Sequence, residues 1–160
     1  MRASQCQQKG IDFIVLNTVY SRVLRFQVKG SRPYPPSASE VHREGAFKYT
    51  FWFNNFHDRY HRGVADVYLL FGLYPIYDTT KNIKSRTKFW DSFALAFTDV
   101  EMGDFLDSIR TKDGQKHDRF FYIGFNDLTE VIVTRSRRDR PNICDHLSAK
   151  RVPELLKQVR

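Results

Sequence analysis

The chain has 160 residues, of which 41% are hydrophobic and 15% aromatic, a composition that excludes a disordered protein. This length suits one domain over residues 1–160 with its own core. The net charge of +8 at pH 7 favours an anionic partner, and nucleic acid is the commonest partner of that kind.

The cysteines and the apolar runs indicate where the protein resides. Cys6 and Cys144 lack the spacing of a zinc site and indicate a reducing compartment, with one long-range disulfide as the alternative. No apolar run approaches the roughly 18 residues of a membrane span, and residues 1–10 lack the apolar core of a secretion signal. We therefore expect a cytoplasmic protein without membrane association.

Two apolar runs near the N-terminus, residues 11–17 and 23–30, predict an antiparallel hairpin. With the turn centred between the runs, Asp12 lies opposite Gln27. Lys29 is two residues further along the strand and therefore shares the face of Gln27. The hairpin thus brings a carboxylate, an amide and an ammonium to one end of a sheet.

Both faces of this hairpin carry apolar side chains, with Ile14, Leu16 and Val23 on the face of the polar trio. A strand that is apolar on both faces is normally buried on both, so we expect the hairpin to be buried. Polar groups buried there need partners or a function, because burying them unpaired costs free energy. The alternative is the usual one, in which such residues face water.

At these residues the chain resembles the PD-(D/E)xK nuclease superfamily, the proteins with the restriction-endonuclease-like fold. In that family an Asp opens one strand of a hairpin and an acidic residue, any residue and a Lys follow on the next strand. Asp12 and the Gln-Val-Lys run at 27–29 correspond to this pattern, and many members carry Gln in place of the acid. The resemblance is specific from Gly10 to Ser31 and implies an α/β fold with a mixed β-sheet flanked by helices.

The resemblance also implies a function, that of a Mg²⁺-dependent deoxyribonuclease, and of an endonuclease in particular. Asp12, the side-chain carbonyl of Gln27 and the backbone carbonyl of Val28 would hold Mg²⁺, for which Mn²⁺ is the expected substitute. A metal-activated water would attack the phosphodiester bond. Lys29 would orient that water or stabilise the charge that grows on the phosphate oxygens. The expected partner is DNA, with a homodimer as an open alternative to a monomer.

The chain departs from the family pattern at three places. Ile11 stands where the Pro of the pattern would be, and Gln27 removes one negative charge from the metal site. Family members usually carry a supporting Glu on an N-terminal helix, whereas no residue before Asp12 is acidic. Either Met1 is an internal start of a longer protein or the site is incomplete. An incomplete site would make the chain a DNA-binding module with weak or no catalysis.

A third interpretation is a structural or regulatory protein that contacts no nucleic acid, which leaves the polar trio and the net charge unexplained.

The remaining elements are predicted from their apolar patterns. Three prolines in residues 30–39 predict a loop, and a helix capped by Asp99 buries Met102, Phe105, Leu106 and Ile109. We expect strands over residues 47–53, 65–73, 93–97, 120–125 and 130–134, and a C-terminal helix over 145–159 with an interruption near Pro153.

Several further residues have two interpretations each. Asp66 is a helper of the active site or a turn cap. The pair His57 and His61 is a weak metal motif, and the aromatics around Trp52 are core residues rather than a stacking platform. Charge runs usually lie in solvent but can also grip phosphates. The residues expected to contact nucleic acid are Arg32, Arg135, Arg137, Arg138 and Arg140.

Overall fold

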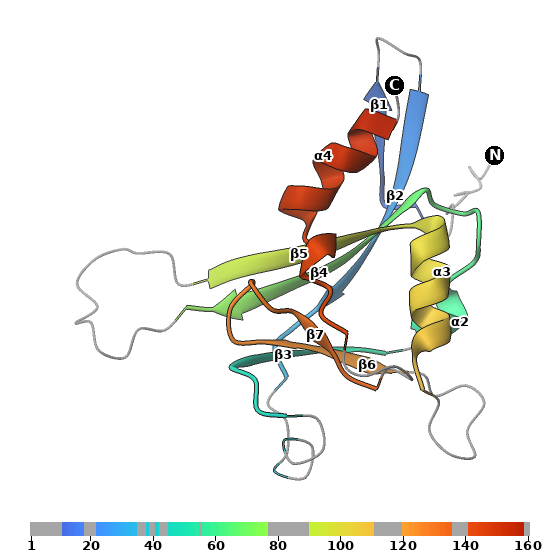
Figure 1. The fold of residues 1–160 in the computed structure, drawn as a ribbon. Helices are drawn as coiled ribbons and strands as arrows, with labels where there is room; N and C mark the ends of the chain where they lie inside the picture. Colours follow the sequence, from blue (N-terminus) through green and yellow to red (C-terminus); the bar gives the residue numbers. More distant parts are fainter. Residues whose placement is uncertain are drawn as a thin grey trace, which may run out of the picture.

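The computed structural model describes residues 11–17, 22–34, 38, 41, 45–54, 56–76, 90–110, 120–135 and 141–158. The strands of this part of the chain form two sheets, here named sheet A and sheet B (Figure 1). Sheet A has the spatial order β1 (Phe13–Asn17), β2 (Arg22–Ser31), β4 (Val67–Pro75) and β5 (Trp90–Thr98). Sheet B has the order β3 (Tyr49–Phe53), β6 (Phe121–Phe125) and β7 (Ile132–Val133). The helices are α2 (Phe56–Arg59), α3 (Asp99–Ser108) and α4 (Ser148–Gln158), with the 3-10 turn η1 (Cys144–His146) before α4.

Sheet A is mixed, because β2 runs antiparallel to β1 and parallel to β4, and β4 runs antiparallel to β5. The register of β1 and β2 is the predicted one, from Phe13 opposite Phe26 to Asn17 opposite Arg22. A slip by one residue would move every side chain to the other face, so the apolar pattern determines this register. The mixed sheet with helices packed on it confirms the α/β class, and the second sheet is a feature that the sequence does not predict.

Strand β2 continues into a segment that joins the two sheets. Pro33 forms a bridge with Phe51 of β3, and the Tyr34 N–H donates to the Thr50 carbonyl at 2.7 Å. The Ser31 hydroxyl donates to the Trp52 carbonyl, also at 2.7 Å. Part of the predicted loop is therefore paired backbone. The prolines permit this because the segment makes only isolated ladder bonds.

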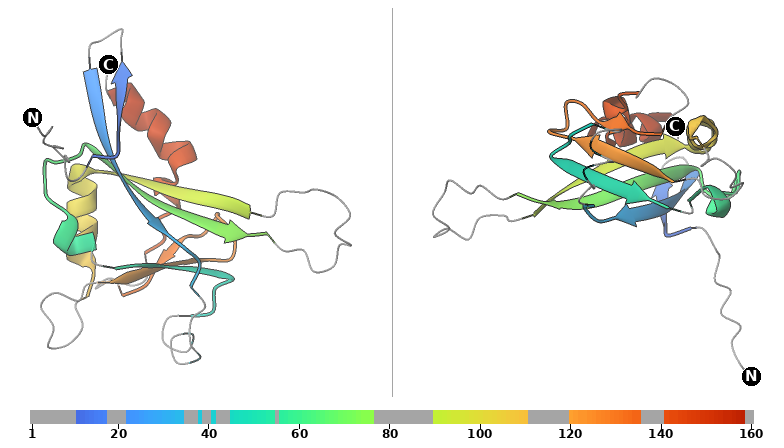
Figure 2. Two further views of the ribbon diagram at one scale, coloured as in Figure 1. Left: turned by 180° about the vertical axis from the view of Figure 1, so that it is seen from behind. Right: turned by 90° about the horizontal axis from the view of Figure 1, so that it is seen from below.

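On the other side, the chain between β7 and α4 links the sheets. Ile132 of β7 forms a bridge with Asn142, and Leu95 of β5 forms a bridge with Leu147. The sheets form two layers in Figure 2, and α3 stands at one end of the space between them in Figure 1. The interior between the layers is therefore closed by hydrogen-bonded backbone on both sides.

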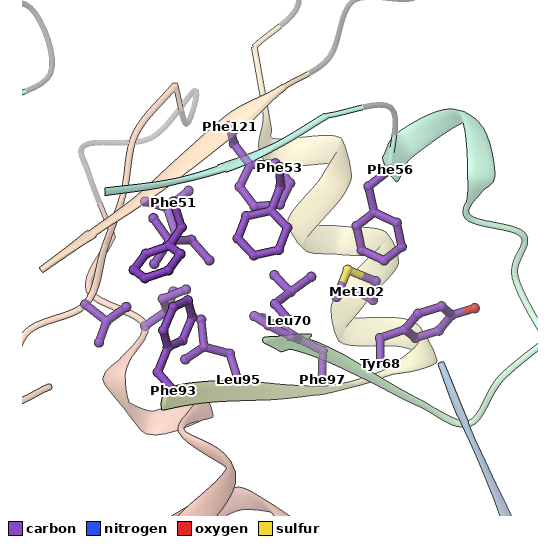
Figure 3. Packing of buried hydrophobic residues seen from close by; sticks show 14 of the residues in the cluster. Phe51, Phe53, Phe56, Tyr68, Leu70, Phe93, Leu95, Phe97, Met102 and Phe121 are labelled. Carbon is purple, nitrogen blue, oxygen red and sulfur yellow. The ribbon is translucent and has the colours of Figure 1, made fainter. Parts of the chain in front are cut away.

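The main core fills this interior with aromatic rings (Figure 3). Alternate residues of each strand point inward, so Phe51 and Phe53 are buried while Trp52 between them faces outward. The Phe51 ring lies with its centre 4.6 Å from that of Phe93 and 5.7 Å from that of Phe125. The expectation that these β3 aromatics form core is confirmed, except at Trp52.

Helix α3 differs from its predicted start. Thr98, rather than Asp99, is the N-cap: its hydroxyl accepts from the Glu101 N–H at 3.2 Å, and the Glu101 carboxylate accepts from the Thr98 N–H at 2.8 Å. Asp99 is the first helical residue, and its carboxylate accepts from the Gly63 N–H at 2.9 Å. Glu101 also forms an ion pair with Arg151, which ties α4 to the start of α3.

The hairpin is not buried on both faces as expected. Leu16 is 66% exposed, and Ile14 and Val23 on the same face are also exposed. The reason is that β4 pairs with β2 only from Phe26 onward, so the outer part of the hairpin projects beyond the sheet (Figures 1 and 2). Helix α4 packs on the other face, where a second cluster contains Phe26, Val67, Ala96 and Leu155.

Helix α4 occupies most of the predicted C-terminal helix. Pro153 lies inside α4 and does not interrupt it, contrary to the prediction. Leu155 is buried, whereas Leu156 is exposed and Val159 lies outside the described residues. In the part of the chain that the structure covers, no helix is long and apolar enough to cross a membrane.

The enclosed core predicts that substituting two glycines in paired strands has different effects on the free energy of unfolding. An added Cβ at Gly72 would lie 2.6 Å from Phe51 Cε1 and closer still to Phe93 Cε1, whereas a Cβ at Gly30 meets nothing within 4 Å. Gly72→Ala should therefore lower the free energy of unfolding by about 1–3 kcal/mol in urea denaturation. Gly30→Ala should change it by less than about 0.5 kcal/mol. Equal effects of the two substitutions would contradict the described packing.

Candidate functional site

Strand β2 presents Gln27 and Lys29 toward the main core. Directly paired residues share a face of the sheet, and the partners of these two residues are Tyr68 and Leu70 of β4, which are fully buried. The sequence-predicted pair therefore lies on the inner face of sheet A. This is also the face of Ile14 and Leu16, as the register predicts.

Asp12 precedes β1 and is exposed, and its carboxylate is held at β2. The Asp12 Oδ2 atom accepts a hydrogen bond from the Val28 N–H at 2.5 Å. The Asp12 N–H donates to the Phe26 carbonyl at 2.8 Å, so the backbone does not pair with Gln27, the residue expected opposite it. The regular ladder thus ends at Phe13. The carboxylate nevertheless lies next to the Gln-Val-Lys run, as predicted.

Gln27 is only 6% exposed, so β2 places a polar side chain at a nearly buried position. Among the described residues, the buried side-chain atoms without a hydrogen-bond partner are Thr134 Oγ1 and Arg151 Nε, and Gln27 is not one of them. The Val28 N–H points toward Asp12, and in a strand the N–H and C=O of one residue point to the same side. The Val28 carbonyl is therefore directed away from β4 and toward Asp12.

The Lys29 ammonium lies over an aromatic ring, with Nζ 5.7 Å from the centre of Phe56. Burial lowers the pKa of Lys29, the positive charge of Arg59 lowers it further, and the Asp12 carboxylate acts in the opposite direction. The expected direct ion pair between Lys29 and Asp12 is absent from the described residues. The ammonium lies instead over Phe56, a residue distant in the sequence.

Arg59 is a residue that the sequence reasoning missed. It ends helix α2, is exposed, and acts on Lys29 strongly enough to lower the pKa of that lysine. The signal for it was the run of charged residues at 57–62, which was interpreted only for its histidines. The charges of Arg59 and Asp12 thus both act on Lys29. A pair of cations suits a phosphate group.

The candidate ligands are all oxygen atoms, namely the Asp12 carboxylate, the side-chain carbonyl of Gln27 and the Val28 backbone carbonyl. Hard cations such as Mg²⁺ prefer oxygen ligands and are often bound by one or two carboxylates together with water, so this set fits Mg²⁺ with a single anionic ligand. Among the described residues, no group of three or more His, Cys, Asp or Glu side chains could hold a metal. The histidine alternative has no support either, because α2 ends before His61 and the imidazole of His57 lies 4.0 Å from the Asp107 carboxylate.

Asp66 is a partner of Arg25 rather than a helper of the site. Its Oδ1 atom lies 2.8 Å from the Arg25 guanidinium, and its Oδ2 atom accepts from Arg25 Nε at 3.1 Å and from the Arg25 backbone N–H at 2.8 Å. These bonds lower the pKa of Asp66. They also continue the contact between β2 and the start of β4 beyond their ladder, so the role of this pair is structural.

The expected nucleic-acid contacts are divided between two places. Arg32 is exposed on the segment that joins the sheets. Arg135 follows β7 and places its guanidinium carbon 3.7 Å from the centre of the Phe120 ring. Arg137, Arg138 and Arg140 lie outside the described residues. Neither described arginine contacts Asp12 or Lys29.

Comparison of the chain with known protein families, curated proteins and solved structures finds no match. The interpretation of the site therefore depends on its own residues and their geometry.

The Arg25–Asp66 contact predicts an acid-dependent loss of stability. A carboxyl pKa that is lower in the folded state contributes stability above the unfolded pKa, near 3.9, and loses it as the pH falls through the folded pKa. Asp66→Asn should lower the free energy of unfolding by about 1 kcal/mol at pH 7, since the pair is partly solvent-screened. The difference from wild type should shrink in urea titrations below about pH 5.

The matched control is Asp104→Asn, which removes an exposed carboxylate of α3. This substitution should change stability by less than about 0.5 kcal/mol. A difference between wild type and Asp66→Asn that stays constant down to pH 2 would contradict the role assigned to the ion pair.

Proposed function

We propose that the chain is a Mg²⁺-dependent nuclease that hydrolyses phosphodiester bonds in DNA, built on the restriction-endonuclease-like fold. The observation that carries the proposal is the hydrogen bond of the Asp12 carboxylate to the Val28 N–H, which holds Asp12 at the strand position between Gln27 and Lys29. The resemblance of the Gln-Val-Lys run to the nuclease pattern and the basic charge of the chain support the same function.

Asp12, Gln27 and the Val28 carbonyl would hold the cation. The Val28 N–H fixes one carboxylate oxygen of Asp12 at 2.5 Å, which orients the other oxygen for a ligand. When bound, Mg²⁺ supplies a water of lowered pKa and neutralises charge on the phosphate. The polypeptide contributes a partly enclosed position, because Gln27 and its neighbour Tyr68 exclude water from the inner face.

Lys29 and Arg59 would bind the scissile phosphate. The ammonium of Lys29 is held over Phe56, so it loses little conformational freedom when it binds a phosphate oxygen. Burial lowers the pKa of Lys29, and a bound phosphate would act on it in the opposite direction. Arg59 adds a second cation from α2 that stabilises the charge on the phosphate oxygens during attack.

A second candidate function is a DNA-binding module without useful catalysis. The specific observation in its favour is that the proposed cation site contains one carboxylate and that no larger acidic cluster occurs in the described residues. Such a module would use the same cations to contact phosphates. Its binding would weaken as the salt concentration rises, because phosphate contacts release counterions.

The nuclease proposal predicts divalent-ion-dependent cleavage of supercoiled plasmid DNA, measured as nicked and linear product in Mg²⁺ or Mn²⁺. Asp12→Asn and Lys29→Met should each reduce the rate by about 100-fold or more, because each removes a group that acts on the transition state. Asp104→Asn and Lys157→Met, which change exposed residues of α3 and α4, are the matched controls and should retain full activity.

Cleavage that survives both site substitutions would overturn the nuclease proposal. Salt-sensitive DNA binding without any cleavage in Mn²⁺ would instead establish the second candidate.

Gln27 offers a test in two directions. Gln27→Glu adds a negative charge to the ligand set and should lower the Mg²⁺ concentration for half-maximal cleavage by about tenfold. Gln27→Leu removes the oxygen ligand at similar volume and should raise that concentration. Both are read from Mg²⁺ titrations of the cleavage rate, and identical titrations for wild type and both variants would show that Gln27 is not a ligand.

A further inference from the structure

The outer face of sheet B carries a cluster of aromatic side chains that the proposed nuclease site does not use. Trp52 of β3 and Tyr122 of β6 are directly paired and point away from the main core. Tyr34 lies over both, with ring centres 6.0 Å from Trp52 and 5.8 Å from Tyr122. Phe120 lies 6.1 Å from Trp52 and 5.7 Å from Tyr122. These four rings are named here the outer aromatic surface.

The outer aromatic surface is partly open to solvent. Trp52 is 41% exposed, and Tyr34 and Phe120 are half-buried. A large aromatic residue that packs only its own neighbours on an outer face gains little from burial there. Trp52 therefore keeps part of its surface exposed beside the rings of Tyr34 and Phe120.

Arg135 completes this surface. Its guanidinium carbon lies 3.7 Å from the centre of the Phe120 ring, which is a stacked cation–π contact. Its φ angle of 64° is the only positive value at a non-glycine position in the described residues, and this conformation is unfavourable for an arginine. Arg110, two residues after α3, donates its N–H to the Arg135 carbonyl at 2.7 Å and stabilises the turn. The fold thus holds a guanidinium over an aromatic ring in spite of local strain.

The charge around the surface favours an anionic occupant. Arg32 is exposed two residues before Tyr34, and Arg135 lies beside Phe120. The outward positions of β3 and β6 carry no acidic side chain, since they are occupied by Thr50, Trp52, Tyr122 and Gly124. An uncharged apolar partner would leave the arginines without a counter-charge. An anion with flat rings matches both features.

We propose that the outer aromatic surface binds single-stranded nucleic acid by stacking unpaired bases on Trp52 and Tyr34, with Arg32 and Arg135 at the phosphates. Stacking on aromatic side chains tolerates any sequence because every base has a flat face. Bases in a duplex are already stacked on one another, so the surface discriminates against double strands. The proposal goes beyond the nuclease function and does not require Asp12, Gln27 or Lys29.

The test is the binding of a labelled oligonucleotide of about 15 nucleotides, a length within the usual site size, followed by fluorescence anisotropy. Oligo-dT and oligo-U are compared with a duplex of equal length. The wild-type chain should bind the single strands more tightly than the duplex. Binding of both single strands would show that stacking dominates, and preference for one would name the natural ligand as DNA or RNA.

Substitutions locate the binding on the surface. Trp52→Ala should weaken single-strand binding by about tenfold, whereas Trp52→Phe, which keeps a flat ring, should retain most of it. Arg135→Gln should weaken binding and reduce its dependence on salt concentration. Trp90→Ala is the matched control, because Trp90 is 51% exposed on β5 of sheet A, and it should bind like wild type.

A spectroscopic measurement keeps the test valid if Trp52→Ala fails to fold. In Trp90→Phe, Trp52 is the remaining tryptophan of the chain, and its fluorescence should be quenched when bases stack on it. The single-strand binding should persist in EDTA, which removes the divalent ion that the proposed nuclease requires, so a failure of the nuclease proposal is distinguishable from a failure of this one. Absence of quenching, equal affinity for duplex, or an equal loss of binding in Trp90→Ala would overturn the proposal.

Discussion

The parallel ladder between β2 and β4 is the constraint on which the rest of the structure depends. It places Gln27 beside Tyr68 and Lys29 beside Leu70, so polar side chains share a face with fully buried ones. The same strand pairs with β1 on its other edge and continues through Pro33 to β3. One strand therefore connects both sheets and also carries the proposed ligands, which is why the position of the ligands relative to the core is fixed by backbone hydrogen bonds.

Local pattern was sufficient to predict the hairpin and its register, because a period of two and a short turn leave few alternatives. It could not show that Lys29 would lie over Phe56, or that Asp66 would form an ion pair with Arg25. Both contacts depend on pairing between segments far apart in the chain. The prediction that the hairpin is buried on both faces was wrong for a similar reason. Apolar residues predict burial, but Leu16 is covered only if the neighbouring strand β4 extends along the outer part of β2, and it does not. At α3, two adjacent residues could serve as the cap, and Thr98 does so because Glu101 completes a capping box with it.

The proposed nuclease site and the outer aromatic surface differ in their chemistry, but residues of both are close in the sequence. Lys29 lies on the inner face of sheet A, and Tyr34 lies on the outer face of sheet B, with the joining segment between them. Cation binding at the first would depend on oxygen ligands and on the metal concentration. Stacking at the second depends on ring faces and tolerates changes in metal concentration. A chain that combined them would hold an unpaired strand with one surface and act on a phosphate with the other.

Arg25 and Asp66 are in contact although they lie 41 residues apart in the chain. The segment between them contains all of β3 and α2. Closing a loop of this length costs entropy before the ladder can offset it, so the pairing forms only together with the sheets around it. The residues proposed for the site all precede β4, and the hairpin alone carries Asp12, Gln27 and Val28. A fragment that ends before β4 would therefore contain these residues but lack the ladder that fixes β2 against the core.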